Sequence, residues 1–215
     1  MRTSCHPILY SFRRCPYAMR ARLALRFAGI TVELREVILK DKPAQLIQIS
    51  PKGTVPVMQL LDGRVIDESI EVAYWALETS DPLSLIPKQD AIDECKALIH
   101  DCDYDFKQWL DKYKYADRHP QYPIEHYREE GEKYLARLEA RLQCQKYLLA
   151  ADSSLADIAI MPFVRQFAMV DMKWFEDSQY TALKRWLTHW LQSEDFLAIM
   201  KKYPQWQEGQ EITLL

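Results

Sequence analysis

The chain has 215 residues, of which 48% are hydrophobic and 27% charged, so it can form one large domain or two small ones with an ample core. Its formal net charge of -3 gives no overall signal for nucleic acid or an anionic membrane, and we expect neither as a partner. The chain has no apolar run near the ~20 residues of a membrane span and no apolar N-terminal signal, so we expect a cytoplasmic protein.

The pattern in the first part of the chain alternates between strand and helix. In chain order it predicts a strand over 8–12, a helix over 15–28, a strand over 32–39, a short helix over 43–49, strands over 57–61 and 64–66 and a helix over 69–79. Asp62-Gly63 is a strong hairpin signal between the last two strands, which should therefore be antiparallel. A helical crossover joins the first two strands, which should be parallel.

The pattern changes after residue 79. Residues 80–87 form a proline-punctuated linker, and the rest of the chain reads as helices over 91–115, 124–142, 155–170, 181–191 and 196–201. Ser154 and Asp157 have the spacing of a capping box at the start of one of these helices. The sequence thus predicts a small mixed α/β domain over 1–79, a linker over 80–87 and an all-α domain over 88–215.

The five cysteines do not follow a disulfide or metal pattern. The cysteines are Cys5, Cys15, Cys95, Cys102 and Cys144. Their number is odd, and no two of them form a Cys-x-x-Cys pair. The position where a dithiol redox protein carries its second cysteine is occupied by Ala18. His100 lies close to Cys102, but no second pair at ligand spacing supports them, so we expect no metal site.

Cys15 is the residue with the strongest chemical signal. It lies in Phe12-Arg13-Arg14-Cys15-Pro16-Tyr17-Ala18, directly after a predicted strand and at the start of a predicted helix. Unpaired N–H groups and the helix dipole favour an anion there, and proline fits the first helical position. Such a setting lowers a thiol pKa from about 8.5 to about 3.5–7.5, so we interpret Cys15 as a nucleophile. The alternative is a buried cysteine kept for packing.

Four segments together carry a family resemblance. They are Arg14-Cys15-Pro16-Tyr17-Ala18, Gly53-Thr54-Val55-Pro56-Val57, Asp67-Glu68-Ser69 and Ser154-Leu155-Ala156-Asp157-Ile158-Ala159. Over its whole length the chain resembles the cytosolic glutathione transferase family, and its cysteine resembles that of omega-type enzymes and their bacterial relatives. The resemblance implies a thioredoxin-like N-terminal domain (βαβ-α-ββα) followed by an all-α C-terminal domain, and a homodimer. Ala150-Ala151 depart from the family pattern, which often has a glycine shortly before the capping motif.

The resemblance also implies a set of glutathione-binding residues. Val55 and Pro56 match the turn with a cis proline, where the Val55 backbone pairs with the cysteinyl part of glutathione. Glu68 and Ser69 match the pair that holds the γ-glutamyl end, and Lys42 matches the omega-type lysine at the glycyl carboxylate. The alternatives are a trans proline entering an edge strand, a simple helix cap and a solvated surface lysine.

The implied activity is glutathione-dependent thiol transfer or reduction through a mixed disulfide at Cys15, with glutathione as co-substrate and no metal. The second substrate, a small electrophile or disulfide, is not revealed by the sequence. The alternatives are a glutathione-conjugating transferase, a glutathione-dependent isomerase, or a non-catalytic interaction protein built on the same fold.

Overall fold

A computed structural model describes residues 5–215, and the chain forms two compact units. The first unit combines the chain up to Leu83 with Glu194–Leu215, and the second consists of Ser84–Ser193. The domain boundaries that we inferred from the sequence stay a prediction. Among the described residues, no helix has both the length and the hydrophobicity needed to cross a bilayer.

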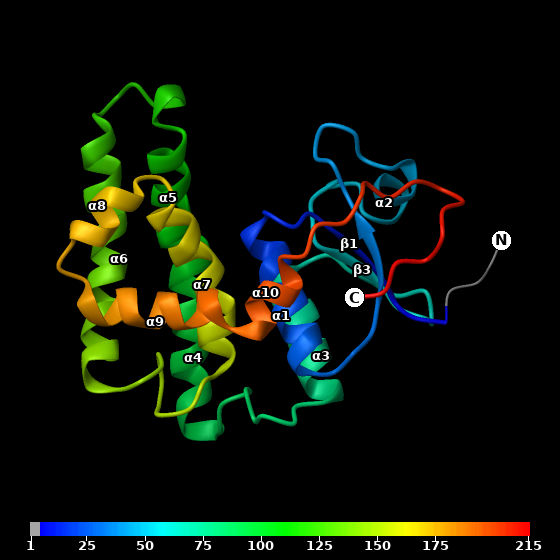
Figure 1. Ribbon diagram of the computed structural model, residues 1–215, viewed down its shortest axis with the longest axis horizontal. Helices are drawn as coiled ribbons and strands as arrows, with labels where there is room; N and C mark the ends of the chain where they lie inside the picture. The colour runs from blue at the N-terminus through cyan, green and yellow to red at the C-terminus, as the bar shows by residue number, and fades with distance from the viewer. Residues whose placement is uncertain (1–4) are drawn as a thin grey trace. The chain divides into compact units, whose positions relative to one another are not determined.

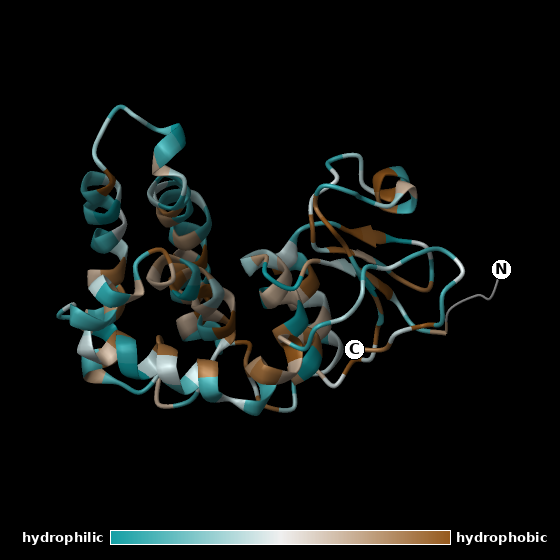
Figure 2. Ribbon diagram, turned by 45° about the horizontal axis from the view of Figure 1, so that its top comes forward, coloured by the Kyte–Doolittle hydropathy of each residue, from teal (hydrophilic) through white to brown (hydrophobic). Residues whose placement is uncertain are grey.

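The first unit is built on a four-stranded mixed sheet with the order β2-β1-β3-β4. Its strands are β1 (Ile8–Ser11), β2 (Glu33–Glu36), β3 (Val57–Gln59) and β4 (Val65–Ile66). β1 is parallel to β2 and β3 is antiparallel to β4, which confirms the two predicted pairings. β1 is also antiparallel to β3, a pairing that was not predicted. Hydrophobic residues are concentrated on the central strands (Figure 2).

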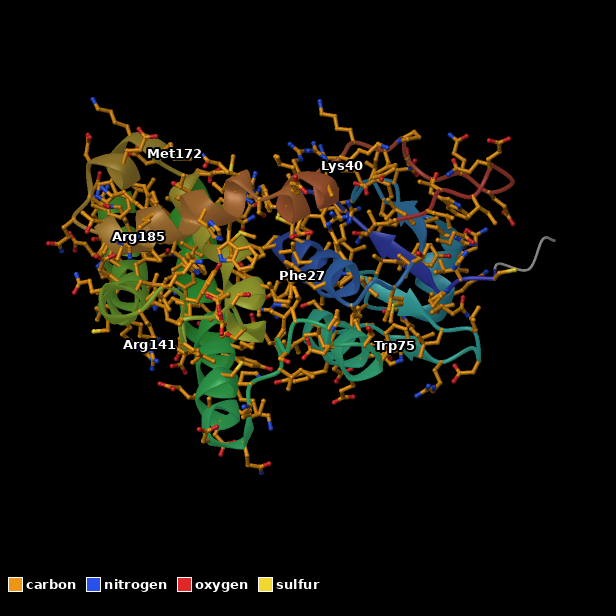
Figure 3. The ribbon with its side chains drawn as sticks, turned by 60° about the horizontal axis from the view of Figure 1, so that its bottom comes forward. Phe27, Lys40, Trp75, Arg141, Met172 and Arg185 are labelled. Atoms are coloured by element: carbon orange, nitrogen blue, oxygen red, sulfur yellow. The ribbon has the colours of Figure 1, made fainter. Side chains whose placement is uncertain are left out.

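The helices of the first unit are α1 (Pro16–Phe27), α2 (Ala44–Ile49), α3 (Ser69–Thr79) and α10 (Glu194–Ile199). α1 lies side by side with α3 and also packs against α10 (Figure 1). Almost every side chain of α1 is buried, and small residues such as Ala21 and Ala24 are completely covered. Phe27 at the end of α1 and Trp75 on α3 are partly exposed (Figure 3).

The last residues of the chain extend the first unit beyond its sheet. Val32 and Leu215 exchange two backbone hydrogen bonds of 3.0 Å, and the Leu34 N–H donates to the Thr213 carbonyl at 2.8 Å. β2 is an edge strand, so this terminal segment covers backbone groups that would otherwise face solvent. The sequence pattern did not predict this return of the chain to the sheet.

The second unit is entirely helical. Its helices are α4 (Gln89–Asp101), α5 (Lys107–Lys114), α6 (Ile124–Cys144), α7 (Leu155–Ala168), α8 (Met172–Asp177) and α9 (Thr181–Gln192). The single helix predicted over 91–115 is wrong in detail, because a π-helical turn at Cys102–Phe106 separates α4 from α5. α8 was not predicted from the sequence pattern.

Two sequence features of the second unit have clear structural reasons. A Cβ atom at Gly131 on α6 would lie 2.4 Å from the Phe167 ring, so only glycine fits this close approach. The predicted capping box at the start of α7 is confirmed, with both of its reciprocal hydrogen bonds formed. The buried Asp157 carboxylate accepts from the Ser154 N–H and hydroxyl, each at 2.9 Å.

Candidate functional site

Cys15 lies at the N-terminal end of α1, where the sequence placed it. Its backbone is extended (φ -77, ψ 125), and Pro16 occupies the first turn of the helix. The Cys15 carbonyl accepts the Met19 N–H at 2.9 Å, and the Cys15 N–H donates to the Phe12 carbonyl at 2.9 Å. The residue is partly exposed, so its thiol lies at a helix N-terminus that a substrate can reach.

The turn before β3 brings Val55 and Pro56 to Cys15. The Val55-Pro56 peptide bond is cis, as the resemblance implies. The Cys15 thiol donates to the Val55 carbonyl with an Sγ···O distance of 3.5 Å. Cys15 also packs against a buried apolar cluster that includes Val55, Tyr10 and Leu46. Residues 40 positions apart in the sequence are therefore in direct contact at this site.

The arginines that precede Cys15 make contacts of their own. The Arg14 guanidinium lies 5.4 Å from the centre of the Phe12 ring. The Arg13 guanidinium donates to the Met200 carbonyl at 3.2 Å. Their charges are near the thiol in sequence, but these contacts are not with its sulfur.

Glu68 and Ser69 lie at the N-terminus of α3. Glu68 is the N-cap residue, but its carboxylate makes no capping hydrogen bond and is exposed to solvent. Ser69 is buried, and its hydroxyl accepts from the Arg20 guanidinium at 3.2 Å. Arg20 comes from α1 and is fully buried, so the two helices are joined at this point. The sequence did not identify Arg20 as part of this site.

Lys52 forms ion pairs with the acidic residues before α3. Its ammonium lies 2.8 Å from the Glu68 carboxylate and 3.1 Å from that of Asp67. Hydrogen bonds to Glu68 and Asp67 raise the pKa of Lys52 above its usual value. The Ser50 hydroxyl donates to the other Asp67 oxygen at 3.1 Å. The Lys52 ammonium and the carboxylates of Asp67 and Glu68 could pair with both charges of a zwitterionic α-amino acid group.

Lys42 lies against the turn that leads to Val55. A Cβ atom at Gly53 would be 3.5 Å from the Lys42 ammonium and 2.9 Å from the Ile47 side chain. Gly53 has a φ of +60, which is also a conformation that other residues rarely adopt. The exposed side chain of Lys42 thus places its ammonium group near Gly53. Among the described residues, no cluster of side chains could hold a metal ion.

A thioredoxin-like sheet with a cysteine at its first helix and a cis proline before β3, followed in the same chain by an all-helical unit, defines a class of protein, the glutathione transferase fold. Two family models match the chain: "Glutathione S-transferase, N-terminal domain" over residues 9–83 and "Glutathione S-transferase, C-terminal domain" over residues 107–189. The chain belongs to the glutathione S-transferase family.

Within the family the chain is similar to omega-type proteins. It is 26% identical over 198 residues to glutathione S-transferase omega-1 of Sus scrofa, covering 91% of this chain and 77% of the relative. The omega-1 protein of Rattus norvegicus is 24% identical over the same length, with the same shares of both chains covered.

Solved structures share the fold. A glutathione transferase family member from Pseudomonas fluorescens, solved with two glutathione molecules bound, has a TM-score of 0.80 at 17% identity, covering 91% of this chain and 92% of that one. Glutathione transferase Omega 3C from Trametes versicolor has a TM-score of 0.77 at 20% identity, covering 94% of this chain and 92% of that one.

Proposed function

We propose that this protein is a glutathione-dependent thiol transferase, or reductase, with Cys15 as its nucleophile. The observation that carries this proposal is the position of the Cys15 thiol, at the N-terminus of α1 and 3.5 Å from the Val55 carbonyl. The similarity to relatives named glutathione S-transferase omega-1 supports an activity that uses glutathione. A hydroxyl in this place would stabilise the thiolate of glutathione itself, whereas a cysteine can form a covalent adduct with it.

In this proposal four further contacts hold glutathione. The backbone of Val55, beside the cis Pro56, pairs with the cysteinyl part. Glu68 accepts from the γ-glutamyl ammonium, while Ser69 at the start of α3 binds the carboxylate at the same end. Lys42 pairs with the glycyl carboxylate. The structure solved with bound glutathione belongs to a protein of the same fold, which makes glutathione the natural ligand to test.

The reaction is two successive thiol–disulfide exchanges. The Cys15 thiolate attacks the glutathionyl sulfur of a mixed disulfide, so that a new S–S bond forms at Cys15 and the old one breaks. The other thiol leaves as a thiolate and takes a proton from solvent. A glutathione thiolate then attacks the adduct, releases Cys15 and leaves as oxidised glutathione. Overall, the mixed disulfide is reduced and its thiol is released, while the second glutathione molecule is oxidised and joined to the transferred glutathionyl group, so the electrons balance.

Residue 18 supports an exchange that uses only one cysteine. Ala18 stands where a second thiol would close an internal disulfide. Among the described residues, the cysteines form no disulfide. The adduct at Cys15 therefore depends on a second glutathione molecule for its release.

The direct test is glutathione-dependent reduction of the mixed disulfide of glutathione and 2-mercaptoethanol by the native protein and Cys15→Ser. We expect turnover by the native protein and its loss in the variant. Turnover by neither protein would reject the proposal. Retention on glutathione-agarose, with elution by glutathione, would then indicate a conjugating enzyme or isomerase, and failure to bind would indicate a non-catalytic protein.

We also propose that the protein forms a homodimer, as the family resemblance implies. Light scattering of the purified protein should give twice the mass of one chain. The mass of a single chain would remove this part of the proposal without affecting the chemistry at Cys15.

A further inference from the structure

A buried ion pair lies beneath the turn that carries Cys15. It joins Arg22, on α1, to Glu36, the last residue of β2. The Arg22 side chain is completely inaccessible and that of Glu36 is 10% exposed. The same guanidinium also donates to the Ser11 hydroxyl at 2.8 Å and to the Ile199 carbonyl at 3.0 Å. Burial lowers the pKa of Arg22, and the Glu36 carboxylate opposes this effect.

The second oxygen of Glu36 binds the backbone of that turn. The Arg13 N–H donates to Glu36 Oε1 at 2.8 Å, two residues before Cys15. The turn is closed by the hydrogen bond from the Cys15 N–H to the Phe12 carbonyl. At the start of the turn, the Ser11 carbonyl accepts the Val37 N–H at 2.8 Å. The carboxylate of Glu36 thus connects the turn to the sheet on one side and to α1 on the other.

The end of α10 is attached to the same network. Arg22 and Arg13 donate to the carbonyls of Ile199 and Met200, and the Glu36 carbonyl accepts the Trp206 N–H at 2.8 Å. All these residues belong to the first unit. The Glu36 carboxylate thus binds the turn and α1, while the end of the chain binds the two arginines and the Glu36 backbone carbonyl.

A buried ion pair is by itself weak evidence for stability, because apolar residues of similar volume are often equally or more stabilising. An apolar side chain at position 36 would, however, leave the Arg13 N–H without its acceptor and the Arg22 charge without a partner. Glu36 therefore fixes the position of the backbone before Cys15, which a hydrophobic residue could not do.

We propose that Glu36 is a positioning residue for Cys15, which holds the nucleophile at the N-terminus of α1 through the Arg13 N–H. This inference rests on the proposed function in that it takes Cys15 as the nucleophile. A displacement of about 1 Å at a reacting group can lower a rate by about 100-fold. Glu36 touches neither substrate nor reacting sulfur, so it acts only through the turn.

The test is Glu36→Asp, which keeps the charge but shortens the side chain by one methylene. We expect kcat for reduction of the mixed disulfide to fall by about 10-fold to 100-fold, with KM for glutathione changed less than about twofold. We also expect the pH midpoint for alkylation of Cys15 by iodoacetamide to rise, because the thiolate loses contact with the N-terminus of α1. A purely structural role would lower thermal stability and change neither readout.

Arg26→Ala is the matched control. Arg26 also joins α1 to α10, through an exposed ion pair of 2.6 Å with Asp195, but it lies in the last turn of α1, at the opposite end from Cys15. It should leave both kcat and the alkylation midpoint unchanged. If Glu36→Asp does not fold, Ser11→Ala removes one Arg22 contact and should move both readouts in the same direction by a smaller amount.

Unchanged kcat and an unchanged alkylation midpoint in the folded variant would overturn the proposal. The alkylation midpoint needs neither glutathione nor turnover. If the native protein does not reduce the mixed disulfide, the proposed function fails, while the alkylation midpoint still decides whether Glu36 positions Cys15.

Discussion

Cys15 differs from the other cysteines in its backbone environment. Cys95 and Cys102 are completely buried in the second unit, whereas Cys5 and Cys144 are exposed away from the start of a helix. Burial raises the pKa of Cys95 to about 12. Only Cys15 combines partial exposure with a helix N-terminus and a neighbouring cis-proline turn.

This difference predicts selective alkylation of the native protein. At pH 8 a thiol with a pKa of about 12 is only about 0.01% thiolate, so Cys95 should not react with iodoacetamide. Cys15 should be modified first, because its thiolate is stabilised by the helix N-terminus. Peptide mass mapping after timed alkylation checks this order. Labelling of Cys95 as fast as Cys15 would contradict it.

Glu68 should determine affinity for glutathione more than the rate of the chemical step. Hydrogen bonds to charged groups contribute about 1.5–3 kcal/mol, so Glu68→Gln should raise KM for glutathione by about 10-fold to 100-fold. Its kcat should stay within about threefold, because Glu68 does not contact Cys15 in the proposed complex. Steady-state kinetics measure both, and Glu71→Gln on the exposed first turn of α3 is the control. Equal effects of the two variants would argue against an ammonium at Glu68.

Local motifs and the family resemblance predict candidate site residues at Cys15, Lys42, Val55, Pro56, Glu68 and Ser69, and their roles stay a prediction. The sequence could not predict Lys52, Arg20 or the Glu36 pair. The Arg20–Ser69 contact spans 49 positions and the Arg13–Glu36 contact spans 23, so no local spacing indicates either. A sequence signal for these buried contacts was the presence of arginines among the apolar residues of α1.

The start of α7 carries several hydrogen bonds to one carboxylate, that of Asp157. Beyond the capping box, the Asp157 carboxylate accepts the Leu148 N–H at 3.0 Å and the Trp186 indole N–H at 2.9 Å. It therefore joins α7 to the preceding loop and to α9 as well as capping its own helix.

Loss of this carboxylate should destabilise the second unit severely. Asp157→Ala leaves several buried donors without an acceptor, each costing about 1–3 kcal/mol, so we expect a loss of at least about 3 kcal/mol in the free energy of unfolding. Asp171→Ala, at the exposed N-cap of α8, should cost only about 1 kcal/mol. Urea denaturation compares the two. Similar losses would show that Asp157 acts only as an ordinary cap.

Element prediction found most helices and strands but missed α8 and the π-helical turn between α4 and α5. The bounds of α3 match the expectation, and α6 and α9 differ from it by only one or two residues at an end. The π-helical turn at Cys102–Phe106 keeps the chain helical and so leaves the apolar period almost unbroken. α8 has only six residues and its N-cap, Asp171, was its one usable signal.

At the scale of the whole molecule, the chain ends in the unit where it begins. The Arg35 guanidinium on β2 lies 4.3 Å from the centre of the Trp206 ring and 5.2 Å from that of Tyr10. Pairing between an N-terminal strand and residues some 180 positions later carries no local sequence signal, which is why composition and periodicity did not predict it.

Trp206 should therefore contribute to the stability of the first unit. Trp206→Ala removes the contacts with Arg35 and Tyr10, and we expect a loss of about 1–2 kcal/mol in the free energy of unfolding. Trp75→Ala is the control, because Trp75 on α3 is also a partly exposed tryptophan of the first unit. The comparison distinguishes loss of the contacts with Arg35 and Tyr10 from the general effect of removing a large side chain. A Trp206→Ala variant as stable as the native protein would show that the terminal segment rests on the sheet without stabilising it.

The proposed activity depends on transfer of the glutathionyl group to Cys15, and this covalent adduct can be observed by mass spectrometry. The protein is incubated with the mixed disulfide of glutathione and 2-mercaptoethanol without reduced glutathione, and its intact mass and peptide masses are then measured. We expect one glutathionyl group, on Cys15, that is released by added glutathione. An adduct on another cysteine, or turnover with Cys15 unmodified, would contradict it.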